Sequence, residues 1–99
     1  MSEPQLNHRR RSVARSPHAI SQVVGDELIV LDPATENFIA LNDVGARIWE
    51  LLADEPHTDR LRDLIAVEYR IGEDQASADL HEFVDRLVDL GLVSCFPAP

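Results

Sequence analysis

The sequence has no lysine, a single cysteine (Cys95) and no long apolar run, and each of these absences excludes something. One cysteine excludes an intramolecular disulfide and any metal site built from several thiolates. We expect a reduced, partly packed thiol, as in a reducing compartment. No apolar run approaches the roughly 20 residues of a membrane span, and none follows the N-terminal arginines as a secretory signal requires. These absences predict a cytoplasmic protein that does not bind a membrane.

The groups that usually carry catalysis are missing or badly placed. The four histidines, His8, His18, His57 and His81, show no metal-ligand spacing, and the chain has no glycine-rich phosphate loop. Its many carboxylates lie in segments with the pattern of solvated helix faces, where no apolar pocket would raise a carboxyl pKa. We therefore expect no enzymatic activity, no metal and no cofactor.

Negative charge dominates the chain, because 18 Asp and Glu residues face nine arginines and give a formal charge of −9. Such a body repels phosphate backbones, which argues against nucleic-acid binding. The arginines are uneven, since Arg9, Arg10, Arg11 and Arg15 crowd the start of the chain. Residues 1–17 lack periodicity, so we expect a disordered basic tail there. The alternatives are an electrostatic arm for an acidic peptide or protein and, behind that, an arm for nucleic acid.

Three apolar segments early in the chain have the lengths and boundaries of strands. Ala19–Val24 alternates loosely, and the Gly25-Asp26 pair after it suits a two-residue hairpin. Leu28–Leu31 is continuously apolar, as in a strand with neighbours on both sides. Asp32-Pro33-Ala34-Thr35 predicts a type I turn, and Asn37–Leu41 follows as the third strand. The pattern predicts an antiparallel meander with its third strand at an edge.

Helical periodicity and capping residues predict three helices over about 42–52, 58–72 and 74–91. Trp49 lies beside the apolar stripe of the first helix, and we expect it in the core. Leu92 and Val93 should fold back onto that core. The fold class is therefore α+β, a three-stranded antiparallel meander followed by three helices.

The third strand is unusual because it is apolar on both faces although it lies at an edge. Soluble proteins usually blunt such an edge with charge or proline, since its free N–H and C=O groups invite another strand. We therefore expect a partner peptide to add there and to pair with the backbone of residues 36–41. Ile39 and Leu41 should serve the core, whereas Phe38 and Ala40 should line the exposed side with Val30 beside them. The candidate binding residues of this region are Val30, Glu36, Asn37, Phe38, Ile39, Ala40 and Leu41.

Four pieces of the chain are informative together: Val30-Leu31-Asp32, Ile39-Ala40-Leu41-Asn42, the run over 45–52 (Gly-Ala-Arg-Ile-Trp-Glu-Leu-Leu), and Leu87-x-x-Leu90-Gly91-Leu92-Val93. In this order and spacing they resemble the PqqD-like family, the recognition elements of ribosomal peptide-modification pathways. The resemblance covers about residues 18–95, with a short tail over 96–99. It implies a small winged helix-turn-helix-like domain that binds the leader of a precursor peptide as an added strand.

The resemblance also implies where the leader lies and which partners follow. The leader would occupy a groove between the third strand and the third helix and be presented to separate modifying enzymes. The motif Leu-Asn-x-x-Gly-Ala-Arg-Ile-Trp, which begins at Leu41, is most similar to the free-standing leader-binding proteins of lasso-peptide pathways. Those pathways imply a separate cysteine protease and an ATP-dependent cyclase as partners. The leaders of this family typically contain the motif Tyr-x-x-Pro-x-Leu. In the binding protein itself, this chain has Phe38 near a position where many relatives have tyrosine.

The third helix should supply the other wall of this groove. For its apolar candidates, the alternative to a role in the groove is a role in the core. For its charged candidates, the alternative is a place on the solvated surface. The helix candidates are Asp79, Leu80, Phe83, Val84, Asp85, Arg86 and Leu87.

Three alternative functions stay open on the sequence. The chain resembles leader-binding chaperones of other pathways, of the pyrroloquinoline quinone or radical SAM type, as well. A winged-helix DNA-binding regulator would need a basic recognition helix, but the second helix begins with a charge-balanced set, Asp59, Arg60, Arg62 and Asp63. A structural subunit or inhibitor could instead use the edge strand to dimerise.

Overall fold

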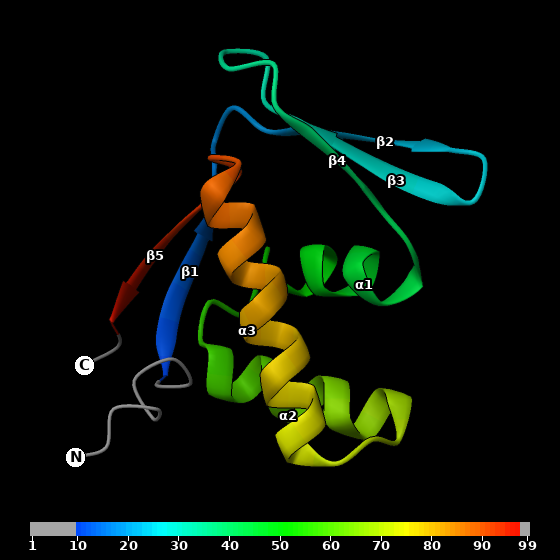
Figure 1. The fold of residues 1–99 in the computed structure, drawn as a ribbon, viewed down its shortest axis with the longest axis vertical. Helices are drawn as coiled ribbons and strands as arrows, with labels where there is room; N and C mark the ends of the chain where they lie inside the picture. The colour runs from blue at the N-terminus through cyan, green and yellow to red at the C-terminus, as the bar shows by residue number, and fades with distance from the viewer. Residues whose placement is uncertain (1–9, 98–99) are drawn as a thin grey trace.

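The computed structural model describes residues 10–97 and folds them into two antiparallel sheets and three helices (Figure 1). The element order is β1 (Arg11–Arg15), β2 (Ile20–Val24), β3 (Glu27–Leu31), β4 (Phe38–Leu41), α1 (Asp43–Leu51), α2 (Thr58–Tyr69), α3 (Glu73–Asp89) and β5 (Val93–Pro97). One sheet has the order β2-β3-β4, and the other pairs β1 with β5. The predicted α+β fold, a meander followed by three helices, is confirmed.

Two turns build the meander. Gly25 has a φ of 62° at the first central position of the β2–β3 hairpin, where a two-residue turn favours glycine. In the β3–β4 turn, the carboxylate of Asp32 accepts a hydrogen bond from the N–H of Ala34 at 2.9 Å. Glu36 then takes a left-handed φ of 65°, which ends the turn and cannot continue into a strand. The strand therefore begins at Phe38, two residues later than the predicted backbone ladder.

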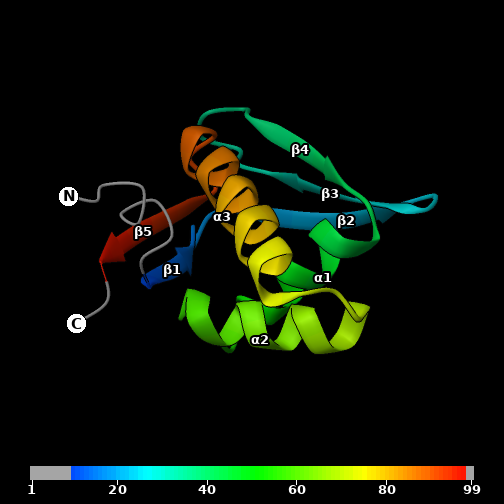
Figure 2. The ribbon, with the colours of Figure 1, turned by 60° about the horizontal axis from the view of Figure 1, so that its bottom comes forward.

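The helical layer meets one face of the β2–β4 sheet through α1, which lies directly beneath the sheet, whereas α2 lies farther from the sheet and packs against α3 (Figures 1 and 2). Alternation along β3 and β4 turns one side chain in two toward this layer. Trp49, Leu92 and Val93 are buried, as predicted. The buried apolar core comprises Val13, Val30, Leu41, Ile48, Trp49, Leu52, Leu61, Ile65, Ala76, Leu80, Val84, Leu87, Leu92 and Val93. None of the helices within residues 10–97 is long and apolar enough to cross a membrane.

The structure corrects the prediction of a disordered tail over residues 1–17. Arg11–Arg15 form β1, which pairs with β5 in a register that sets Val13 opposite Cys95, and Val13 is only 1% exposed. Phe96 and Pro97, predicted to be tail, belong to β5. The parts of these predictions that concern residues 1–9 and 98–99 lie outside the described residues.

The basic residues of β1 are strand residues with specific partners, which explains the error. The guanidinium of Arg15 lies 4.5 Å from the centroid of the Trp49 ring, a cation–π contact. Arg11 donates a hydrogen bond to Asp85 at 2.9 Å. A strand of this kind buries a single valine between arginines, so its composition is that of a solvated tail.

Candidate functional site: a groove between a free strand edge and a helix

The strand β4 has a free edge, because among the described residues it pairs with β3 alone. The N–H of Asp32 donates a hydrogen bond to the C=O of Asn37 at 2.9 Å, so these two residues form a hydrogen-bonded pair. Every second residue pair along an antiparallel ladder is of this kind. In the register that follows, Ile39 and Leu41 exchange hydrogen bonds with β3. The intervening residues, Phe38 and Ala40, therefore direct their peptide N–H and C=O groups toward the free edge.

The side chains of β4 divide between the two faces as predicted. Leu41 is buried and Ile39 half-buried, whereas Phe38 is 62% exposed and Ala40 is exposed. The prediction for Val30 is wrong, because its side chain is fully buried. Val30 lies directly opposite Ile39, and residues paired in this way project to the same face of a sheet. It therefore belongs to the core face and not beside Phe38.

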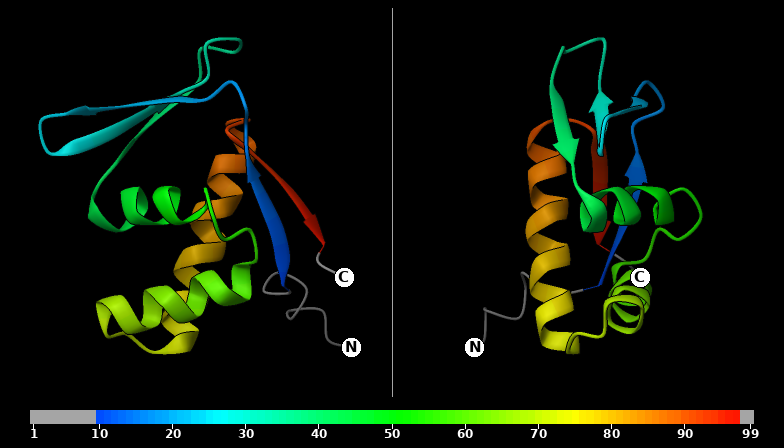
Figure 3. Two further views of the ribbon diagram at one scale, coloured as in Figure 1. Left: turned by 180° about the vertical axis from the view of Figure 1, so that it is seen from behind. Right: turned by 90° about the vertical axis from the view of Figure 1, so that its right-hand side faces the viewer.

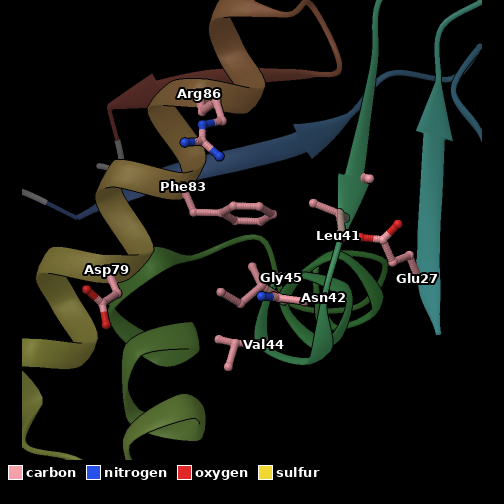
Figure 4. Close-up of a pocket in the computed structure, with 10 residues that line it drawn as sticks. Glu27, Leu41, Asn42, Val44, Gly45, Asp79, Phe83 and Arg86 are labelled. Carbon is pink, nitrogen blue, oxygen red and sulfur yellow. The ribbon is translucent and has the colours of Figure 1, made fainter.

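The helix α3 runs alongside the free edge, as the right-hand view of Figure 3 shows. Between them lies a cavity of about 240 Å³ with walls from β4 and α3 and a floor from α1. Figure 4 shows the ring of Phe83 projecting from α3 toward Leu41 on β4. The lining residues are Glu27, Ala40, Leu41, Asn42, Val44, Gly45, Ile48, Asp79, Phe83 and Arg86.

Gly45 sets how closely the three walls approach. A Cβ atom on this residue would lie 3.3 Å from Cδ2 of Leu41 and 3.4 Å from Cε1 of Phe83. Both distances are at the tight limit of van der Waals contact. The missing side chain lets β4, α1 and α3 converge at the floor of the groove.

A hydrogen bond connects β4 and α3 at one end of the groove. The side-chain amide of Asn37 donates a hydrogen bond to the C=O of Leu90 at 3.0 Å, which ties the start of β4 to the end of α3. From this tie the two elements diverge toward the N-terminal half of α3 (Figure 1). The cavity lies beyond this tie, where Asp79, Phe83 and Arg86 line it from α3.

The structure brings only some of the predicted helix residues to the groove. Phe83 lines its wall, and Asp79 and Arg86 lie exposed at its rim. Asp85 lies on the other side of the helix, where it accepts a hydrogen bond from Arg11 of β1. The remaining candidates are buried in the core and do not line the cavity: Leu80, Val84 and Leu87.

The sequence-based prediction missed the contribution of α1 and of the start of β3. Asn42, Val44, Gly45 and Ile48 line the cavity from the strand–helix junction, and Glu27 reaches it from β3. The signal for the junction was present, because a glycine in the first turn of a helix that follows an edge strand indicates a close approach. Glu27 had no such signal, since its position depends on the register of β3 against β4.

Charge around the groove is mixed. Glu27 and Asp79 lie at its rim with Arg86, and Asp79 also accepts a hydrogen bond from Gln75 at 2.9 Å. Behind the groove, hydrogen bonding to Glu68 at 2.9 Å raises the pKa of Arg47 above its ordinary value. That pair links α1 to α2 and helps to hold the helix that forms the floor.

The helix α2 offers little positive charge to nucleic acid. The guanidinium of Arg62 lies 2.8 Å from the carboxylate of Asp63, and that of Arg60 lies 3.9 Å from Glu55. A recognition helix needs cations that are available to phosphates. The electrostatics of α2 therefore weigh against a DNA-binding regulator.

Comparison with known proteins agrees with this geometry. A family model described as "Coenzyme PQQ synthesis protein D (PqqD)" matches residues 27–93, more than half of the chain. The chain belongs to the PqqD family. The resemblance noted in the sequence is thereby confirmed.

Two solved structures are similar to this PqqD-family chain. "TbiB1 in complex with the TbiA(beta) leader peptide" shares 28% identity at a TM-score of 0.74, over 82% of this chain and 94% of that one. "Lasso peptide synthetase B1 complexed with the leader peptide" shares 20% identity at a TM-score of 0.74, over 84% and 98%, and shows the fold alone. No curated protein sequence gives a significant match.

Proposed function

We propose that this chain is a non-catalytic recognition protein that binds the leader of a ribosomally made precursor peptide by strand addition to β4. The observation that carries the proposal is the free edge at Phe38 and Ala40, which borders a cavity with partly apolar walls. Main-chain hydrogen bonds to an edge give register, and pockets for alternate side chains give specificity. The similar structure of TbiB1, which was solved with a leader peptide, supports the same role.

The groove favours a leader with apolar anchors. In an added strand, successive side chains point to opposite faces, so every second leader residue faces the cavity lined by Leu41, Gly45 and Phe83. Affinity then comes from a few buried apolar groups, reduced by the cost of ordering a flexible peptide. We expect a dissociation constant between about 1 nM and about 1 μM.

We further propose that the pathway is of the lasso-peptide type. The 28% identity with TbiB1 over most of both chains supports this assignment. The bound precursor would pass to a separate cysteine protease that removes the leader and to an ATP-dependent cyclase. The family description favours a second candidate, a leader-binding role in pyrroloquinoline quinone synthesis, which shares the groove and differs in the partner enzymes. Either role belongs in the cytoplasm, where precursors are made.

The first test is a titration with the synthetic leader of the precursor encoded nearest the gene, followed by amide NMR and hydrogen exchange. In the free protein, the amides of Ile39 and Leu41 should exchange slowly because they bond to β3. The amides of Phe38 and Ala40 should exchange fast and become protected when the leader binds. Saturable binding without new protection at these two amides would contradict strand addition.

A matched pair of variants locates the groove. Ala40→Asp places a charge at the proposed interface, and Ala14→Asp adds the same charge at another exposed strand position, on β1. We expect at least a tenfold loss of leader affinity for the first variant, about 1.4 kcal/mol, and no change for the second. Equal affinities for both variants would exclude the groove as the binding site.

A further inference from the structure

Asn37 lies at the end of the groove where β4 is tied to α3, and its backbone is held from two sides. Its C=O accepts a hydrogen bond from the N–H of Asp32 at 2.9 Å, and its N–H donates one to Oγ1 of Thr35 at 3.2 Å. The β3–β4 turn thus fixes the point from which the side chain of Asn37 reaches the C=O of Leu90, at 3.0 Å. Leu90 is the C-cap residue of α3, and the last carbonyls of a helix have no partner within it. The tie therefore links two elements that are each already ordered.

The open edge of β4 stops at this tie. The edge-facing residues are Phe38 and Ala40, so the same alternation would next present Glu36. Glu36 has a left-handed φ of 65°, and its N–H donates to the C=O of Asp32 at 2.7 Å. The N–H of Asn37 is also engaged within the turn. An added strand therefore gains no backbone donor from the two residues that precede Phe38.

The tie also closes the space that an added strand would need. Alternation places Asn37 on the same face of the sheet as Ile39 and Leu41, which is the face toward the helices. A strand that continued along the edge past Phe38 would have to enter between Asn37 and Leu90, where donor and acceptor are 3.0 Å apart. A hydrogen bond of this length leaves no room for an intervening atom. The cavity, which neither residue of the tie lines, lies wholly to one side of it.

Strand addition by itself does not define which leader residue lies opposite which residue of β4. Main-chain hydrogen bonds are alike at every position, and a shift of the leader by two residues returns each of its side chains to the same face. The edge of β4 offers only Phe38 and Ala40, so the ladder is also short. A short, periodic ladder needs a stop at one end if the leader is to bind in a single register.

We infer that Asn37, through its bond to Leu90, is a positioning residue that fixes the register of the bound leader by closing the groove at Phe38. This inference rests on the proposed function. In a single register the precursor leaves the sheet at one residue. Its segments outside the groove then begin from one fixed point.

The test separates the tie from the turn that carries it. Asn37→Ala removes the side chain, and Asn37→Asp keeps its size but removes the N–H donor. The control is Thr35→Ala, which removes one hydrogen bond from the same turn and leaves the tie in place. Each protein is titrated with two synthetic leaders of the precursor encoded nearest the gene, one with a nitroxide label at each end. Broadening of the amide signals of β4 then reports how far each label lies from the strand.

In both Asn37 variants we expect a second register, in which one label lies about 7 Å closer to the amides of Phe38 and Ala40 and the other about 7 Å farther away. The affinity should change by less than about fivefold, because the ladder and the cavity remain. Thr35→Ala should give the wild-type pattern.

Three outcomes would overturn the inference. The wild-type pattern in both Asn37 variants would show that the tie does not set the register. A second register in Thr35→Ala would assign this role to the turn as a whole, and one in Asn37→Ala alone would assign it to the bulk of the side chain and not to its bond with Leu90. Failure of the proposed function would show separately, as absence of leader binding to the wild-type protein, and would remove the inference with it.

Discussion

The strands β1 and β4 both lie beside α3, but only one of them has a satisfied outer edge. On the side away from β5, the N–H of Val13 donates to the C=O of Pro56 at 2.8 Å and that of Arg11 to Oγ1 of Thr58 at 2.8 Å. The edge of β4 that faces α3 has no such cover among the described residues. The chain closes one edge with an ordinary loop and leaves the other open next to a cavity. Of these two strands, only β4 therefore has an edge that is open to an added strand.

The two sides of α3 show the same contrast in their side chains. On the β1 side, Arg11 contacts both Asp85, at 2.9 Å, and Nδ1 of the buried His81, at 2.6 Å. On the β4 side, Arg86 lies exposed at the rim of the cavity. One face of the helix is already occupied by a strand of this chain, and the opposite face borders the space in which we propose that a foreign strand binds.

The largest expected difference in stability comes from placing the same negative charge on β1 and, in a second variant, on β4. Val13→Asp buries an unpaired carboxylate in the core and should lower the free energy of unfolding by at least about 3 kcal/mol. Ala40→Asp, on an exposed site, should change it by less than about 0.5 kcal/mol. Urea denaturation measures both. A stable Val13→Asp protein would show that β1 is not part of the cooperative fold.

A smaller effect on stability is expected from substitution of the arginines on the two sides of α3, which are Arg11 of β1 and Arg86 of α3 itself. Arg11→Ala removes hydrogen bonds to Asp85 and His81 and should cost about 1–2 kcal/mol of stability. Arg86→Ala should leave the stability within about 0.5 kcal/mol and act on leader affinity, which calorimetry would measure. The reverse assignment, with stability lost at Arg86 and affinity at Arg11, would invert the comparison.

A small net effect on stability is also expected from a substitution at the floor of the groove. Gly45→Ala gains about 1 kcal/mol of helix propensity but brings a Cβ atom against Leu41 and Phe83. The two terms should leave the free energy of unfolding within about 1 kcal/mol of the wild type. Displacement of Phe83 into the cavity should weaken leader binding by roughly tenfold, or about 1.4 kcal/mol. An unchanged affinity would mean that the leader does not reach the floor.

The open edge could be predicted from the sequence because its signals are local. Two turns and a run of apolar residues define the meander, and alternation along a single strand assigns Phe38, Ile39 and Ala40 to their faces. Val30 was misplaced because its face depends on its register against a neighbouring strand. Assigning a face across strands requires a pairing that no single segment contains.

The errors at the two ends of the chain and at Asp85 have one origin, the unrecognised strand β1. Its partner β5 lies about 80 residues away in the chain, and a pairing over such a distance leaves no local pattern. Without β1, nothing distinguished Asp85 from Arg86, neighbours about 100° apart on the helix. The position of Arg11 decides between them, since it holds Asp85 on the side away from the groove.

The pairing of β1 with β5 bears on how this domain can be excised or transplanted. The family match spans residues 27–93, and a fragment cut there would lose β1 and nearly all of β5. A fragment that starts at residue 18 would keep β5 but expose the edge and the core side chains that β1 covers. It would then offer a peptide an additional vacant edge, on β5, and binding measured on the fragment would combine binding at the native groove with binding at this artificial edge.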